Sequence, residues 1–252
     1  MIRRSRKLAL ALTATLALAG PATAIDFNAL SPADRSALDT EIHNYIVTHP
    51  EVLVEAYTAL QTKQADAQAN ADAALVKANA DAIFKDGYSY VGGNPKGNIT
   101  LVEFTDYRCT YCRRAYNEVN ELVKSDGNIR FIVKEFPILG DQSTISARYA
   151  IAVMQADGPA VYDKIHDALI TFRGEVNKDS LTRLSNQFGL NATDLLARMD
   201  SPEVTKVINE NHALGNALQI NGTPTFVVAD QMWRGYVPLD NMRQILAKIR
   251  SE

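Results

Sequence analysis

Residues 102–112 read VEFTDYRCTYC, and they join a predicted strand to a predicted helix. The strand, Ile99 to Phe104, is rich in β-branched and apolar residues, whereas Arg113 to Lys124 has apolar residues at helical spacing. Cys109 and Cys112 are the only cysteines of the chain, and they stand where this helix begins. Unpaired backbone N–H groups and the helix dipole stabilise a thiolate at such a position. One turn separates the two sulfurs, so the pair can give or accept two electrons, which predicts redox chemistry.

Other chemistries share the C-x-x-C spacing. A structural disulfide that closes so short a loop contributes little chain-entropy stabilisation. A c-type haem site needs histidine directly after the second cysteine, where this chain has Arg113. Structural zinc needs four ligands, and no second ligand pair is formed by His43, His49, His166 or His212. The last two histidines fall in predicted helices, where we interpret them as polar-face residues. We predict no metal and no cofactor, with binding of a soft metal by the two thiols as the open alternative.

The first residues indicate export. Four basic residues within the first seven positions precede an apolar stretch from Leu8 to Ala19. The following Ala22-Thr23-Ala24 fits a signal-peptidase cleavage pattern. A membrane anchor needs roughly 20 apolar residues, and this stretch is about a dozen residues long. We therefore predict a cleavable signal peptide, residues 1–24, and a soluble protein in an oxidising compartment in which disulfides persist.

Charge and composition narrow the function classes further. Residues 1–24 carry four basic and no acidic residues, so their removal changes the formal net charge from −3 to about −7. No basic stripe offsets this balance, which argues against a nucleic-acid partner. The remaining chain is long enough for one elaborated domain and an appendage, and the 46% hydrophobic content of the full sequence suffices for a core.

The appendage, residues 25–87, is predicted to be helical. Ser31 is a suitable N-cap with Pro32 in the first turn, and one apolar face follows, made by Leu38, Ile42, Tyr45 and Ile46. A second helical pattern runs from Pro50 to about Phe84. Alternating steps of three and four residues trace a seam through Leu53, Tyr57, Leu60, Gln64, Ala67, Ala71, Ala74 and Ala78. We expect residues 25–84 to form a homo-oligomer through these faces; the alternative is a solvated helical linker that packs on its own domain.

Residues 88–252 alternate strands and helices, which predicts an α/β domain. After the cysteine helix comes a second strand, Ile129 to Phe136, followed by helical patterns alone from Ser143 to Leu218. Strands return at Thr225 to Ala229 and at Met232 to Tyr236, joined by a tight Asp230-Gln231 turn, before a last helix from Leu239 to Ile249. The order predicts a split βαβ…ββα core with a helical insertion at about 141–219.

These features together resemble a known family. The run at residues 102–112, the central helical insertion and the sequence GTPTF at residues 222–226 before a hairpin are similar to the DsbA-type branch of the thioredoxin superfamily. The resemblance covers Tyr88 to Glu252 and implies a thioredoxin-like fold in a bacterial periplasm. The sequence HPEVL at residues 49–53 further resembles the ScsC and Com1-like members, some of which oligomerise through that region.

The resemblance also implies roles for individual residues. Thr223-Pro224 would form a cis peptide that faces the cysteines, and an extended substrate segment would pair with the backbone beside it. Glu103 occupies the position of a buried acid in thioredoxin-like proteins. Because burial raises a carboxyl pKa, it would suit a proton acceptor for Cys112. The alternative is that Glu103 faces solvent from an edge strand.

The predicted mechanism is thiol–disulfide exchange, in which Cys109 attacks a client and Cys112 resolves the mixed disulfide. Strong DsbA oxidants carry Pro-His between the cysteines, whereas Thr110 and Tyr111 stand here, and the tyrosine cannot carry a positive charge. Tyr111 and Thr223 instead resemble features of the isomerase DsbC. The resemblance implies that Thr110-Tyr111 and Thr223-Pro224 would contact the substrate. We therefore predict a periplasmic disulfide isomerase or reductase that acts on cysteine-containing exported proteins and is reset by a membrane redox partner. The alternatives are a DsbA-type oxidase, a copper(I)-binding copper-tolerance protein and a non-catalytic holdase.

Overall fold

The computed structural model describes residues 26–251, and these fall into two compact units that divide between Leu60 and Gln61. The expected signal peptide, residues 1–24, lies outside the described residues. No helix among residues 26–251 has both the length and the apolar character that crossing a membrane requires.

The first unit is entirely helical. It contains α1 (Pro32–Thr48) and the beginning of α2 (Glu51–Ala78). The Ser31 hydroxyl accepts the backbone N–H of Asp34, which caps α1 as its sequence predicts. No residue of α1 is buried. Large apolar side chains of this unit are exposed, namely Phe27, Ile42, Tyr45, Val47, Leu53, Val54, Tyr57 and Leu60. The N-terminal helical appendage is therefore confirmed, and it has no core of its own.

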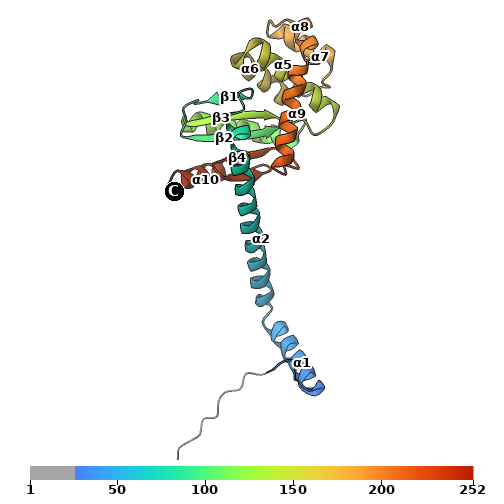
Figure 1. The fold of residues 1–252 in the computed structure, drawn as a ribbon, viewed down its shortest axis with the longest axis vertical. Coiled ribbons are helices and arrows are strands. Elements are labelled where there is room, and N and C mark those ends of the chain that lie inside the picture. The colour runs from blue at the N-terminus through green and yellow to red at the C-terminus, as the bar shows by residue number, and fades with distance from the viewer. Residues whose placement is uncertain (1–25, 252) are drawn as a thin grey trace, which may run out of the picture. The chain divides into compact units, whose positions relative to one another are not determined.

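The second unit contains a five-stranded sheet with the strand order β1-β3-β2-β4-β5 (Figure 1). The strands are β1 (Tyr90–Gly93), β2 (Ile99–Thr105), β3 (Ile129–Glu135), β4 (Thr225–Val228) and β5 (Gln231–Arg234). The pair β2 and β3 is parallel, and the other pairs are antiparallel. The strand that leads to the cysteines, β2, is thus the central one and is covered on both faces.

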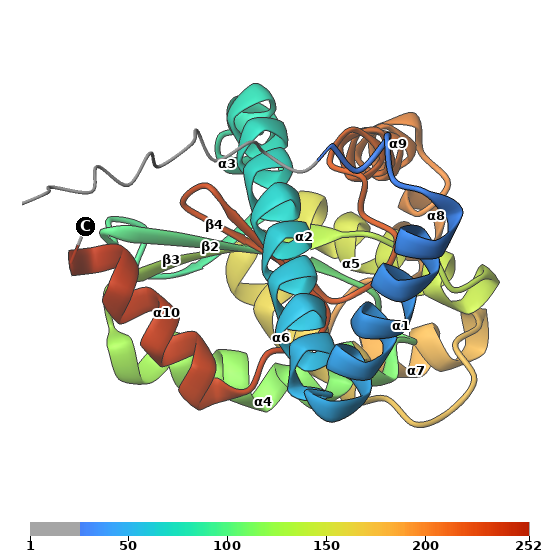
Figure 2. The same ribbon diagram turned by 90° about the horizontal axis from the view of Figure 1, so that it is seen from below.

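Helices cover the two faces of this sheet (Figures 1 and 2). On one face, α4 (Thr110–Asp126) and α10 (Leu239–Ser251) share an apolar cluster with Leu101 of β2 and Phe226 of β4. The other face carries the end of α2, α3 (Ala80–Phe84) and α9 (Pro202–Ala217), which pack around Val102 of β2. The alternation of Leu101 and Val102 between the two clusters follows from the two-residue period of a strand.

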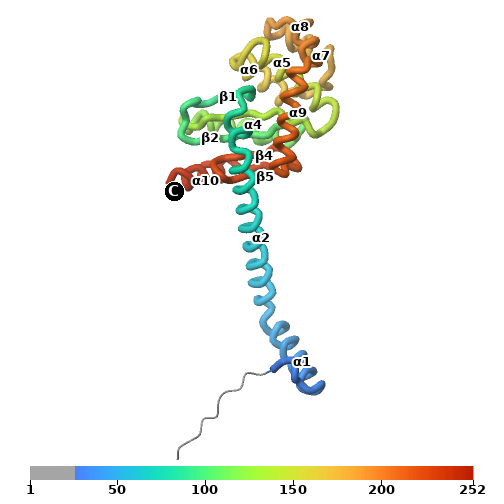
Figure 3. Tube along the Cα trace, in the orientation of Figure 1, coloured from blue at the N-terminus to red at the C-terminus, as the bar shows by residue number. Residues whose placement is uncertain are grey.

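The helical insertion forms a third apolar cluster. It consists of α5 (Asp141–Asp157), α6 (Pro159–Thr171), α7 (Lys178–Gln187) and α8 (Ala192–Arg198), with α9 running back from it to β4 and β5 (Figure 3). Tyr107, Cys109 and Cys112 belong to this cluster, so the insertion packs against the cysteine loop. The α/β fold with a central helical insertion is confirmed.

Several element boundaries differ from the sequence predictions. Helix α4 begins at Thr110 rather than Arg113, because Cys109 itself is the N-cap. The helix predicted from Pro50 to Phe84 is interrupted at Asn79, which separates α2 from α3. The hairpin turn lies at residues 229–230 rather than at Asp230-Gln231. Strand β1 was not predicted, because two of its four residues are glycines, which weaken the strand signal.

Candidate functional site

The thiol of Cys109 lies at the N-terminus of α4. Its sulfur accepts the backbone N–H of Cys112 at 3.4 Å and donates to the Thr223 carbonyl oxygen at 3.0 Å. The pKa of Cys109 is lowered to about 6, chiefly by a hydrogen bond from the Cys112 thiol and further by the Thr223 side chain and the N–H groups of Cys112 and Tyr111, although burial opposes the shift. Cys109 can therefore be largely thiolate at neutral pH.

Cys112 has the opposite character. It is a free thiol like Cys109, but it is almost completely buried. Burial raises its pKa far above the ordinary value, and the hydrogen bond to Cys109 and the negative charge of Glu103 add to the shift. The two thiols thus differ in pKa in the way that suits an attacking and a resolving thiol. Cys109 ionises readily, whereas Cys112 keeps its proton until a base removes it.

Glu103 lies on the central strand, opposite Phe226 of β4, and it is 5% exposed. The alternative in which it faces solvent from an edge strand is therefore wrong. Burial raises its pKa to about 8. Its charge acts on Cys112, which places a carboxyl of suitable pKa within electrostatic reach of the buried thiol. Its role as the proton acceptor remains a proposal.

The loop before β4 brings Thr223 and Pro224 to the cysteines. The Thr223–Pro224 peptide bond is cis, as the resemblance implies, and the Thr223 carbonyl faces Cys109. The Pro224 carbonyl accepts the N–H of Gly235, which ties the loop to the end of β5. The Thr223 hydroxyl is buried and has no hydrogen-bond partner among the described residues, but it is near enough to Cys109 to lower the thiol pKa.

Thr110 and Tyr111 lie on the open side of the same site. Both are exposed in the first turn of α4, and 59% of the Tyr111 surface is accessible. An aromatic ring so exposed beside Cys109 is placed to contact a bound segment. A contact of either residue with a substrate remains a proposal.

Asp106 is a site residue that the sequence analysis missed. Its side chain accepts the backbone N–H groups of Arg108, Ile138 and Leu139 at 2.8, 2.8 and 3.1 Å, and its carbonyl accepts the N–H of Cys109 at 3.0 Å. Asp106 is 1% exposed and joins the cysteine loop to the segment after β3. An aspartate between a strand and a helix N-cap favours such a turn, and this signal could have found it.

A second polar cluster anchors Tyr107 of the same loop. The Tyr107 hydroxyl donates to the Glu135 carboxyl at 2.6 Å and lies 2.9 Å from His166 Nδ1, and Tyr162 donates to the same carboxyl oxygen at 2.6 Å. Burial raises the pKa of Glu135 to about 8 and lowers that of His166 to about 4. The interpretation of His166 as a polar-face residue is wrong, because its ring packs among tyrosines and is buried.

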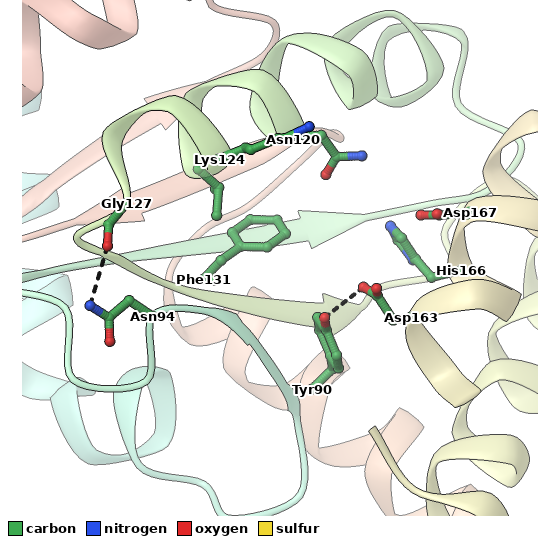
Figure 4. Close-up of a pocket in the computed structure, with 11 residues that line it drawn as sticks. Tyr90, Asn94, Asn120, Lys124, Gly127, Phe131, Asp163, His166 and Asp167 are labelled. Atoms are coloured by element: carbon green, nitrogen blue, oxygen red, sulfur yellow. Dashed lines mark hydrogen bonds between the residues drawn. The ribbon is translucent and has the colours of Figure 1, made fainter. Parts of the chain in front are cut away.

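His166 also lines a pocket of about 450 Å³ (Figure 4). Tyr90 donates to Asp163 at 2.6 Å on one side of it, and the Asn94 amide donates to the Gly127 carbonyl on another. Neither cysteine lines this pocket, so it is separate from the dithiol site. Among residues 26–251, no three His, Cys, Asp or Glu side chains gather closely enough to hold a metal ion.

The fold and the dithiol at a helix N-terminus define a thioredoxin-like protein with a helical insertion. Residues 100–247, more than half of the chain, match the family described as DSBA-like thioredoxin domain, and the chain belongs to that family. Residues 34–67 match the copper resistance protein ScsC N-terminal domain.

Solved structures of similar fold include three with sequence identities above 25%. A thioredoxin-like oxidoreductase from Silicibacter pomeroyi DSS-3 is 40% identical, with a TM-score of 0.64 over 68% of this chain and 98% of that one. BcfH from Salmonella enterica Typhimurium is 26% identical, with a TM-score of 0.70 over 86% and 96% of the chains. The thiol-disulfide exchange protein α-DsbA2 from Wolbachia pipientis is 26% identical, with a TM-score of 0.67 over 73% and 98%.

Curated relatives include longer proteins. The Na⁺/H⁺ antiporter NhaA 1 of Salinispora arenicola is 26% identical over 146 residues, which are 58% of this chain and 22% of the antiporter. This chain thus spans less than a quarter of the length of the first relatives it matches. The disulfide bond formation protein D of Bacillus subtilis is 20% identical over 166 residues, 62% of this chain and 74% of that protein.

Proposed function

We propose that the chain is a periplasmic thiol–disulfide oxidoreductase that acts as a disulfide isomerase or reductase on exported proteins. The difference between the two thiols carries this proposal. Cys109 has a lowered pKa and faces the Thr223 carbonyl, whereas Cys112 is buried with a raised pKa. Such a pair separates the attack on a disulfide from its resolution. Family membership supports the same chemistry.

In the proposed reaction the Cys109 thiolate attacks a client disulfide, which forms a mixed disulfide and releases one client sulfur as a thiolate. Cys112 then loses its proton, for which Glu103 is the candidate acceptor because its charge acts on this thiol, and the Cys112 sulfur attacks Cys109. The client leaves with two thiols, and the protein holds a Cys109–Cys112 disulfide, so two electrons have moved to the client. In isomerisation, a client thiol instead attacks the mixed disulfide before Cys112 does.

The pKa of Cys109 supports isomerase or reductase over oxidase. At pH 7 a pKa of about 6 favours the reduced protein by about 1.4 kcal/mol, which is about 30 mV for a two-electron couple. A strong oxidant has a thiol pKa near 3.5, which gives a several-fold larger bias. The oxidase remains the alternative within the same chemistry.

The proposed partners follow from export and from the first unit. Clients are cysteine-containing exported proteins, and a membrane redox partner would reset the dithiol. We propose that residues 25–87 form the oligomerisation segment and residues 88–252 the catalytic domain. Exposed Leu53, Tyr57 and Leu60 recur along α2 and are suited to contact another copy, which the match to the ScsC N-terminal domain also supports.

Copper(I) binding is the second candidate. The two sulfurs are soft ligands, and the matched N-terminal family carries copper resistance in its description. Against it, the described residues contain no group of three His, Cys, Asp or Glu side chains that could hold a metal ion. The dithiol therefore supports exchange chemistry better than a metal site.

Refolding of scrambled ribonuclease tests these functions. We expect recovery of activity that Cys109→Ala abolishes, while Cys112→Ser leaves a long-lived mixed disulfide with the client, detected by mass spectrometry without reductant. No recovery, together with tight stoichiometric copper(I) binding, would favour the metal function. Recovery that survives loss of both cysteines would indicate a holdase.

The reduction potential of the Cys109–Cys112 pair separates the redox directions. A value near that of protein disulfide isomerase, about −180 mV, or lower is expected. A value near that of DsbA, about −120 mV, would contradict the isomerase preference and support the oxidase.

A further inference from the structure

Three arginines from separate parts of the second unit meet beside Cys109. Arg108 precedes the cysteine, Arg113 follows it by one turn of α4, and Arg173 lies in the loop between α6 and α7. The Arg108 guanidinium donates to the Gly174 carbonyl at 3.2 Å, which joins the loop of Arg173 to the cysteine loop. Burial lowers the pKa of Arg113, and the positive charges of Arg108 and Arg173 lower it further.

The backbone holds Arg113 at this place. Its N–H donates to the Cys109 carbonyl at 3.1 Å, and its Nε donates to the Tyr107 carbonyl at 2.9 Å. Its Nη2, in contrast, is buried and has no hydrogen-bond partner among the described residues. An unsatisfied buried donor on a charged group costs free energy, which a suitable acceptor would recover. The guanidinium therefore has an unused donor beside the reacting sulfur.

This arginine cluster, Arg108, Arg113 and Arg173, has little counter-charge. Within residues 26–251, none of the three forms an ion pair with an aspartate or glutamate. The negative groups that act on Arg113 are the Cys109 thiolate and the carboxylate of Asp106, and three backbone N–H groups already bind that carboxylate. The formal charge of the whole chain is negative, so the cluster is a local excess of positive charge.

Attraction between the Cys109 thiolate and Arg113 accounts for only part of the cluster. The largest contributions that lower the Cys109 pKa come from the Cys112 thiol, the Thr223 side chain and backbone N–H groups, and no arginine is among them. Arg173 is exposed and Arg108 is half-buried, so an incoming molecule can reach them. A planar guanidinium can donate two parallel hydrogen bonds to one carboxylate. Arginines therefore recognise a carboxylate specifically, in addition to attracting any negative charge.

Resting on the proposed function, we propose that the arginine cluster binds a carboxylate of the disulfide substrate, so that the site prefers clients with an acidic residue beside the reacting cysteine. In this step the Cys109 thiolate attacks the sulfur next to the acidic residue. The Cys109–client bond forms, the client disulfide breaks, and the other client sulfur leaves as a thiolate. The carboxylate takes no part in the electron transfer and only positions the sulfur.

Three symmetrical peptide disulfides test the preference. They differ only in the residue after the cysteine, which is aspartate, asparagine or lysine. The reduced full-length protein is mixed with each peptide, and the second-order rate of mixed-disulfide formation is measured by rapid quenching and mass spectrometry. We expect the aspartate peptide to react about fivefold faster than the asparagine peptide and the lysine peptide to be slowest, with differences that shrink at high salt.

Variants assign the preference to the cluster. Two substitutions should reduce the ratio of the aspartate rate to the asparagine rate. Arg173→Gln removes a charge at an exposed position, and Arg113→Lys keeps the charge but loses the paired N–H donors of the guanidinium. Arg183→Gln removes an exposed arginine of α7 outside the cluster and should leave the ratio unchanged. The pH at which the rate with the asparagine peptide is half-maximal should also stay constant in Arg173→Gln.

The outcomes separate this inference from the proposed function. Equal rates for all three peptides would overturn the carboxylate preference and leave thiol–disulfide exchange intact. The inference would also be overturned if Arg183→Gln lowered the ratio of aspartate to asparagine rates as much as Arg173→Gln does. The same holds if Arg173→Gln shifted the pH of the half-maximal rate enough to account for its lower ratio. If no peptide forms a mixed disulfide with Cys109, the proposed function fails and the inference fails with it.

Discussion

From Gln61 onward the chain buries charged and polar groups, whereas residues 26–60 leave large apolar groups exposed. Glu103, Glu135 and Cys112 are all buried in the second unit, and burial raises the pKa of each. In the first unit α1 buries nothing, and Tyr45 and Tyr57 are each more than half exposed. Burial thus shifts pKa values in the second unit, whereas the large apolar side chains of the first unit stay exposed.

The difference has a consequence for how each unit works. The second unit contains both sulfurs, the acid beside them and the loop that faces them, so the proposed thiol–disulfide exchange would need only one chain. In the proposed oligomer the apolar faces of the first unit are buried against another copy, so the contribution of this unit would depend on protein concentration. We therefore expect the two units to respond independently to substitution.

Charges on the apolar face of α2 should give the largest effect. Leu53 and Leu60 lie on the same side of the helix, because seven residues make almost two complete turns. In Leu53→Glu/Leu60→Glu, each charge buried between copies would cost about 3 kcal/mol or more. We expect the variant to sediment as a monomer where the wild-type protein is an oligomer.

Thr62→Glu is the matched control, since Thr62 is exposed and lies on the opposite side of α2 from Leu53. It should sediment like the wild type. In the double variant the rate at which Cys109 reacts with a small disulfide should be unchanged, because its surroundings all lie in the second unit. A wild-type protein that is itself monomeric would contradict the oligomer.

Sequence prediction succeeded where the signal is local or carried by the family resemblance. The cysteines, the strand before them and the helix after them lie within 30 residues, and the periods of their apolar residues differ. The cis peptide at Pro224 came from the resemblance alone, because a proline that heads a strand fits trans as well. The burial of Glu103 also came largely from the resemblance, since strand alternation does not tell an edge strand from a central one.

The features that prediction missed depend on residues distant in sequence. Asp106 binds the N–H groups of residues 138 and 139, and Tyr107 meets His166, which is 59 residues away. A histidine on a helix gives no sign that three tyrosines surround it. The meeting of Arg108 with the loop of Arg173 is likewise set by how the insertion packs, which periodicity does not report.

The pH dependence of stability tests the burial of Glu103. Its pKa rises from 4.5 to about 8 on folding, so the folded protein keeps a proton that the unfolded chain loses. This contribution to stability is fully present below pH 4.5 and is lost as the pH rises through 8. Relative to Glu103→Gln, the parent protein should lose up to about 5 kcal/mol across this range, at about 1.36 kcal/mol per pKa unit.

The measurement is best made by urea unfolding with Cys109→Ala and Cys112→Ala in both proteins, because the thiols then do not titrate. Glu55→Gln, which removes an exposed carboxylate of α2, is the matched control for the loss of a charge. The difference in the free energy of unfolding between the parent and Glu103→Gln should change between pH 4 and pH 9. A constant difference would show that folding does not raise the pKa of Glu103.

The smallest effect concerns the point along α2 at which burial begins. From Glu51 to Ala71 no side chain of the helix is buried, and Asp72 is the first that is. Its carboxylate accepts from Arg234 Nη2 at 2.7 Å, and the same guanidinium donates to the carbonyls of Leu218 and Gln219, which precede the Thr223–Pro224 loop. Asp72 thus ties α2 to an arginine that also holds the residues before the Thr223–Pro224 loop.

Because the Asp72 side chain is 6% exposed but that of Arg234 is 31% exposed, water screens part of this ion pair. We expect Asp72→Asn to lower the free energy of unfolding by about 1–2 kcal/mol, less than a fully buried pair would lose. Asp81→Asn, which breaks the exposed pair with Lys85, is the control and should cost below about 0.5 kcal/mol. If the two substitutions cost the same in urea unfolding, burial at Asp72 does not strengthen the pair. The first residue of α2 whose burial stabilises the fold would then be Val76, which packs in an apolar cluster and forms no ion pair.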